Sequence, residues 1–155
     1  MTRRFQNFIN GRSIPPNSND WIDSVNPATG EVWAQIARSN VVDVRLAVES
    51  AKRASEQHDW RYNSANRSKI LHDIADRLDS EHQKLIEIEI NDNGKRIREV
   101  KAQMLGLGDW YRHFAVALVH MEVEKLNLNL DGVSAYLDLI PYGVVGAITA
   151  WNSPL

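Results

Sequence analysis

The fold class is indicated by residues 144–151, which read VVGAITAW. A continuous apolar run of this length is typical of a β-strand that is buried on both faces of a parallel sheet. Each parallel neighbour needs a crossover connection of about a dozen residues or more, yet only four residues follow this run. We therefore expect an α/β protein whose sheet begins here and whose other parallel strands lie outside these residues.

The residues before this run also predict strand. Two sets of side chains alternate over residues 133–140: Val133, Ala135, Leu137 and Leu139 against Ser134, Tyr136, Asp138 and Ile140. Strict alternation predicts a strand with one buried face.

The first forty residues predict a small antiparallel β unit. Asn10 and Gly11 lie between apolar residues, and this dipeptide favours a tight hairpin because both central positions of a type I′ turn need a positive φ. Residues 21–25 and 31–37 predict two further strands, because the intervening 26–30 segment has the composition of a turn.

The middle of the chain predicts helices. Apolar residues at steps of three and four over 44–54 indicate a first helix, with Ser39 or Asn40 as its N-cap. Ser64 is expected to cap a second helix whose apolar residues extend to Leu78.

A third helical segment is expected to begin at Ser80. Its LIEIEI stretch (85–90) also fits a strand, but the cap at Ser80 and the stop at residues 93–94 favour helix. A fourth helix is predicted from about residue 96 to 124, weakened in its middle by Gly106 and Gly108.

Composition excludes several classes of protein. The chain has 155 residues, enough for one domain or part of a larger one, and its hydrophobic and charged shares of 43% and 25% are those of a globular protein. A net charge of −2 does not favour nucleic acid as a partner, and no apolar run approaches the ~20 residues of a membrane span. The N-terminus has no apolar signal segment, so we expect a cytoplasmic protein.

The sequence contains no recognisable metal-binding or phosphate-binding motif. With no cysteine, the sequence can form neither disulfides nor thiolate zinc sites, and it supplies no cysteine nucleophile. The histidines lack metal-ligand spacing, and no familiar glycine-rich phosphate loop occurs. Glu87 and Glu89 are two apart on the expected helix and therefore point apart, so we expect a solvated face there and no acid/base pair.

One candidate for chemistry is Asn152, in the string WNSP after the predicted buried strand. Open α/β sheets bind ligands at the carboxyl ends of their strands. A side-chain amide there can donate to a developing oxyanion without titrating. Asparagine is also common before a proline turn, so a purely structural role is the alternative.

Several strings in order resemble the N-terminal third of the aldehyde dehydrogenase family. They are FINGR (8–12), NPATGE (26–31), Trp60 with Arg67, Ile70 and Leu71, NDNGK (91–95), WYRHFA (110–115) and PYGVVGAITAWNSPL (141–155). Arg96 and Ala150 stand where the family usually has proline.

This resemblance implies an enzyme that oxidises an aldehyde to a carboxylic acid with NAD or NADP. In the family a cysteine thiolate attacks the carbonyl carbon, and a glutamate later activates water to hydrolyse the thioester. The position of Asn152 implies a donor to the oxyanion, and the cofactor contacts implied by the resemblance are Ile148, Thr149, Ala150 and Trp151. Trp151 has an equally good reading as a core aromatic residue. No metal is implied.

The resemblance also implies that the nucleophilic cysteine and the glutamate base lie beyond residue 155. We therefore expect this chain alone to be inactive and to bind the cofactor weakly. Substrate-tunnel residues are implied within 105–114, but they do not identify the aldehyde.

The implied organisation has three parts. Residues 1–122 are expected to belong to the cofactor-binding domain, 123–141 to an oligomerisation β arm, and 142–155 to the first buried strand of the cofactor-binding sheet. Family members are dimers or tetramers, so a homo-oligomer through the arm is expected. Two alternatives stay open: a non-catalytic fragment or association protein with this fold, and an unrelated α/β binding module.

Overall fold

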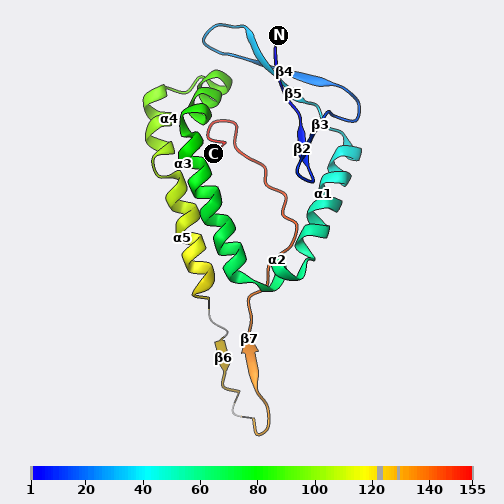
Figure 1. Cartoon of the computed structure of the whole chain (residues 1–155), viewed down its shortest axis with the longest axis vertical. Helices are drawn as coiled ribbons and strands as arrows, with labels where there is room; N and C mark the ends of the chain where they lie inside the picture. The colour runs from blue at the N-terminus through cyan, green and yellow to red at the C-terminus, as the bar shows by residue number, and fades with distance from the viewer. Residues whose placement is uncertain (1, 122–123, 129, 155) are drawn as a thin grey trace.

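The computed structural model describes residues 2–121, 124–128 and 130–154. Figure 1 shows an N-terminal group of short strands above two separate groups of helices. One group contains α1 (Val41–Ser55), and the other contains α3 (Ser64–Asn93) with α4 (Ile97–Met104) and α5 (Leu107–Val119). The C-terminal segment runs between the two groups, and a small β arm extends from the end of the molecule opposite the N-terminal strands (Figure 1).

The N-terminal β unit largely agrees with its prediction. Strands β2 (Asn7–Ile9) and β3 (Arg12–Ile14) form an antiparallel hairpin, and the φ values of Asn10 and Gly11 are 53° and 73°. Strands β4 (Trp21–Val25) and β5 (Val32–Ala37) also pair antiparallel.

One strand of this unit was not expected. Strand β1 (Arg3–Phe5) adds to β5 in the parallel direction, so the sheet has the order β1-β5-β4 and is mixed. The expectation of a purely antiparallel unit is therefore wrong. Three residues are too few to show a period of two, and their partner lies about thirty positions away.

Helix α1 begins at a complete capping box. The Asn40 side chain accepts a hydrogen bond from the Val42 amide at 2.8 Å, and Asp43 accepts one from the Asn40 amide at 2.9 Å. Of the two predicted caps, Asn40 is therefore the one used. A short helix, α2 (His58–Tyr62), lies between α1 and α3.

Helix α3 corrects the prediction of two segments divided at Ser80, because it runs unbroken for 30 residues. The Ser80 hydroxyl donates to the Arg77 carbonyl at 2.9 Å inside the helix and does not cap a new one. The N-cap is Asn63 and not the expected Ser64. The predicted end is confirmed, since Gly94 is left-handed with a φ of 71°.

The prediction of a single helix over residues 96–124 is also wrong. This region contains two helices, α4 and α5, and the second ends at Val119. Leu105 and Gly106 separate α4 from α5, and the Gly106 backbone departs from ideal helical geometry with φ −108° and ψ 0°. Both helices pack against α3 around the buried side chains of Ile86, Val100 and Met104.

The C-terminal part forms less strand than predicted. Strands β6 (Glu124–Leu126) and β7 (Ala135–Leu137) make an antiparallel hairpin, but the rest of 133–140 is irregular and Leu137 is 50% exposed. Most of the predicted buried strand at 144–151 is irregular too, and Ile148 is fully exposed. A doubly buried strand needs parallel neighbours, and the described residues supply none beside it.

Candidate functional site

A tight turn at residues 150–153 carries the candidate oxyanion donor. Ala150 and Ser153 form an isolated antiparallel bridge, which leaves Trp151 and Asn152 at the centre of the turn. Asn152 is exposed. Pro154 follows and disfavours helical backbone at Ser153. The turn therefore presents the amide of Asn152 on an open surface.

Lys95 joins this turn to the helices. Its ammonium donates to the backbone carbonyl of Asn152 at 2.9 Å and to the Ser153 hydroxyl at 2.7 Å. On the helical side it donates to Gln103 of α4 at 2.6 Å and lies 3.3 Å from a carboxylate oxygen of Glu89 on α3. Figure 1 shows the C-terminal segment curling back beside α3, and Lys95 directly follows Gly94, the C-cap of this helix. A single cation thus contacts α3, α4 and the turn.

Glu89 contradicts the expectation of a solvated glutamate face. Its side chain is only 3% exposed, and that of Lys95 is 17% exposed. Removing one partner of a buried pair costs about 3–5 kcal/mol, because the other charge is left without compensation. Position Glu87 remains exposed as expected.

Sequence reasoning missed both members of this pair. The string NDNGK was noted as a family resemblance, but its lysine was not assigned a role. The available signal was the stop at Gly94, which turns the chain so that the next side chain returns toward the helix it has just left. Lys95, the partner of Glu89, lies beyond the end of α3, so local helical spacing does not reveal the pair.

The four predicted cofactor contacts lie along an open edge. Ile148, Thr149, Ala150 and Trp151 are all exposed, and Trp151 retains 82% of its accessible surface. No phosphate-binding cation or glycine-rich loop accompanies them within this stretch. These four residues therefore provide an exposed, largely apolar surface.

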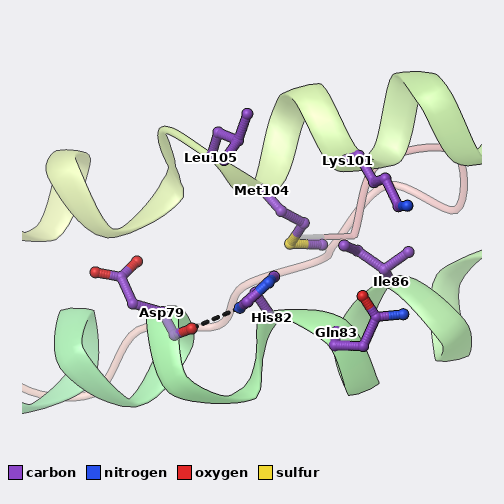
Figure 2. Close-up of a pocket in the computed structure, with 7 residues that line it drawn as sticks. All are labelled: Asp79, His82, Gln83, Ile86, Lys101, Met104 and Leu105. Carbon is purple, nitrogen blue, oxygen red and sulfur yellow. Dashed lines mark hydrogen bonds between the residues drawn. The ribbon is translucent and has the colours of Figure 1, made fainter.

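A separate groove of about 540 Å³ lies between α3 and α4. In Figure 2, His82 and Ile86 of α3 lie opposite Met104 of α4, and the Leu105 side chain points away from α3. The His82 Nδ1 lies 2.7 Å from the Asp79 carbonyl oxygen. The groove does not include the turn at 150–153.

An acidic cluster lies beside this groove. Arg112 donates to Asp76 at 2.7 Å and to Asp79 at 2.6 Å, and these hydrogen bonds raise the pKa of its guanidinium above the ordinary value. The cation ties α5 to α3 by pairing with both carboxylates, so we assign the cluster a structural role.

Within the ranges described, no group of three or more histidine or acidic side chains is arranged to hold a metal ion. A search of the same residues finds no helix with the length and hydropathy needed to cross a membrane.

Comparisons with known proteins identify the family. The model of the family described as "Aldehyde dehydrogenase family" matches residues 14–155. An aldehyde dehydrogenase of Deinococcus radiodurans is 39% identical over 155 residues, covering 99% of this chain and 30% of the relative. A (Z)-2-((N-methylformamido)methylene)-5-hydroxybutyrolactone dehydrogenase of Acinetobacter baylyi is 33% identical over 154 residues, covering 99% of this chain and 31% of the relative.

Solved structures agree. A betaine aldehyde dehydrogenase double mutant from Staphylococcus aureus, in complex with NAD+, superposes with a TM-score of 0.89 at 26% identity, covering 95% of this chain and 30% of that one. An NAD-dependent aldehyde dehydrogenase from Sinorhizobium meliloti superposes with a TM-score of 0.78 at 27% identity, covering 84% of this chain and 26% of that one.

The chain therefore belongs to the aldehyde dehydrogenase family, and it spans about 30% of the length of the curated relatives it matches. Its mixture of helices and strands is part of that family's α/β fold, as predicted. The alternative of an unrelated α/β binding module is excluded.

Proposed function

We propose that this chain is the N-terminal part of an enzyme that oxidises an aldehyde to a carboxylic acid with NAD or NADP in the cytoplasm. The observation that supports this most strongly is the continuous family match over residues 14–155, which ends in the turn bearing Asn152. The reacting cysteine and glutamate of the family are supplied by residues outside this chain, which has no cysteine.

The role of Asn152 is to stabilise charge. When a thiolate adds to the aldehyde carbon, the C=O π electrons move to oxygen and an oxyanion forms. The amide of Asn152 donates a hydrogen bond to that oxygen, and a neutral amide does so at any pH near neutrality. Its exposed place in the turn supports this role, because the group is open to a substrate brought by the rest of the enzyme.

The remaining parts of the proposal follow the family organisation. NAD or NADP, when bound, accepts the hydride. Residues 148–151 lie against the cofactor once other residues complete the site. Residues 1–122 and 142–155 belong to the cofactor-binding domain, and 123–141 form an arm that joins subunits in a dimer or tetramer.

A second candidate function is association without catalysis. The observation in its favour is the exposed apolar surface of the arm region, where Val133, Tyr136, Leu139 and Ile140 are each more than half exposed. The chain alone has no nucleophilic cysteine, so association is the capacity it retains by itself.

A chimera tests the catalytic proposal. The chain replaces the aligned segment of the Deinococcus radiodurans relative, and aldehyde-dependent NAD(P)H formation is followed at 340 nm. Asn152→Ala is expected to lower kcat by about 10²–10³, the usual cost of removing an oxyanion donor. Gln6→Ala, which removes an exposed amide between β1 and β2, is the control and should retain the parental rate.

Two results would count against the proposal: a folded chimera without activity, and an Asn152→Ala chimera with the full kcat. Loss of activity in the Gln6→Ala control would show that the measured effect is not specific to the turn.

A further inference from the structure

The turn at 150–153 has few supports of its own. Ala150, Trp151 and Asn152 are exposed and Ser153 is half-buried, and the segment leading into the turn is irregular from 138 to 149. An oxyanion donor must nevertheless be held in place, because a displacement of about 1 Å can cost two orders of magnitude in rate. Something outside the turn must therefore define its position.

Lys95 meets that requirement. It follows Gly94, which ends α3, and its ammonium is held from the helical side by Gln103 and by the buried Glu89. An ammonium has three N–H donors. Two of its short contacts go to the turn, one to the Asn152 carbonyl and one to the Ser153 hydroxyl.

The contact with the Asn152 carbonyl is the important one. Fixing the carbonyl oxygen of a residue restricts rotation of the adjoining backbone, and this restricts the direction of the Cα–Cβ bond. The charge of Glu89, which is 3% exposed, strengthens the hold on the ammonium because little water screens the pair.

We propose that Lys95 is a positioning residue, which orients the Asn152 amide by tying the backbone of the turn to the buried carboxylate of Glu89. This inference rests on the proposed function of Asn152. Lys95 does not touch the substrate, and its ammonium is already occupied by acceptors from the protein.

The first test measures the turn itself, in the 155-residue chain. NMR relaxation gives backbone order parameters for Trp151, Asn152 and Ser153, which we expect near ~0.85 in the parent and below ~0.6 in Lys95→Met. The matched control is Lys84→Met, which removes an exposed lysine of α3 that pairs only with Glu81 among the ion pairs of the described residues. Unchanged order parameters in Lys95→Met would overturn the proposal.

Removing Lys95 also leaves Glu89 buried and unpaired, so a second variant is needed that keeps this pair. Ser153→Ala deletes one acceptor of the ammonium and retains the Glu89 contact. Ser153→Ala should also lower the order parameters of the turn, but by less than Lys95→Met does. Helical circular dichroism verifies that each variant is folded.

The second test uses the active chimera and asks whether Lys95 acts through Asn152. Lys95→Met is expected to lower kcat roughly ten- to a hundredfold with little change in the aldehyde KM. In a chimera that already carries Asn152→Ala, the same change should cost less than about twofold, because no donor remains to be positioned. Lys84→Met should have no effect in either background.

The outcomes are distinguishable. If the costs of Lys95→Met and Asn152→Ala multiply, Lys95 only stabilises the fold and the positioning role is wrong. If Asn152→Ala retains full kcat, the proposed function fails, and the positioning role fails with it. Lost order at 151–153 together with non-multiplicative kinetics would support the proposal.

Discussion

Gly94 fulfils two requirements at one position. Its φ of 71° closes α3, and a Cβ built on it would lie 2.5 Å from Cγ of Pro27. Pro27 belongs to the turn between β4 and β5, and the neighbouring Asn26 amide donates to Asn91 at 2.9 Å. The end of α3 is thereby fastened to the N-terminal β unit, next to the lysine that holds the C-terminal turn.

We expect Gly94→Ala to lower the free energy of unfolding by about 1–3 kcal/mol. Alanine is strained in a left-handed backbone, and its Cβ would clash with the ring of Pro27. Gly106→Ala is the matched control: its φ is negative, and a Cβ there meets no atom of the described residues within 4 Å. Its effect should stay within about 0.5 kcal/mol. Urea unfolding followed by circular dichroism measures both, and equal losses would contradict this account.

Local chemistry explains which residues were predicted correctly. The Asn10-Gly11 turn, the Asn40 cap and the Gly94 stop depend on residues within a few positions, so the local sequence is enough to predict them. Glu89 was misjudged because its partner, Lys95, lies beyond the end of α3, where local helical spacing does not reveal it. The role of Asn152 stays a prediction.

At the scale of elements, helix boundaries were the weakest part of the prediction. Ser80 has the composition of a cap, yet its hydroxyl is satisfied by the Arg77 carbonyl and α3 continues through it. Gly106 was noted as a weak point, but a break there depends on how α4 and α5 each pack against α3. Hydrophobic periodicity identified helix over these regions and could not identify where packing interrupts it.

The β6–β7 arm carries its own prediction. Its exposed apolar side chains should drive self-association of the chain, since an uncovered edge with an apolar face favours pairing. Sedimentation velocity should show oligomers that shift to monomer when Val133→Lys and Leu137→Lys are combined, because charge at the edge opposes pairing.

The control for the arm is Leu105→Lys, which changes an 82% exposed leucine in the link between α4 and α5. This variant should associate as the parent does. A parent chain that sediments as a monomer at all concentrations would rule out association through the arm.

At the scale of the whole molecule, the predicted family and α/β class are confirmed by the comparisons. The apolar run at 144–151 predicts a buried strand that needs parallel neighbours, and in the structure this run is mostly irregular and exposed. A buried strand forms only when neighbouring strands pair with it, so its own sequence can indicate that neighbours are needed but cannot supply them.

We propose that this chain contributes an oxyanion donor to a reaction whose nucleophile is supplied by other residues. The most direct measurement follows NAD(P)H at 340 nm, with short aliphatic and aromatic aldehydes, on the isolated chain with an intact mass of 17.6 kDa. We predict no turnover, because the chain has no cysteine to attack the carbonyl. Robust turnover by a sample of that mass would contradict the account, since another nucleophile would then have to act within these residues.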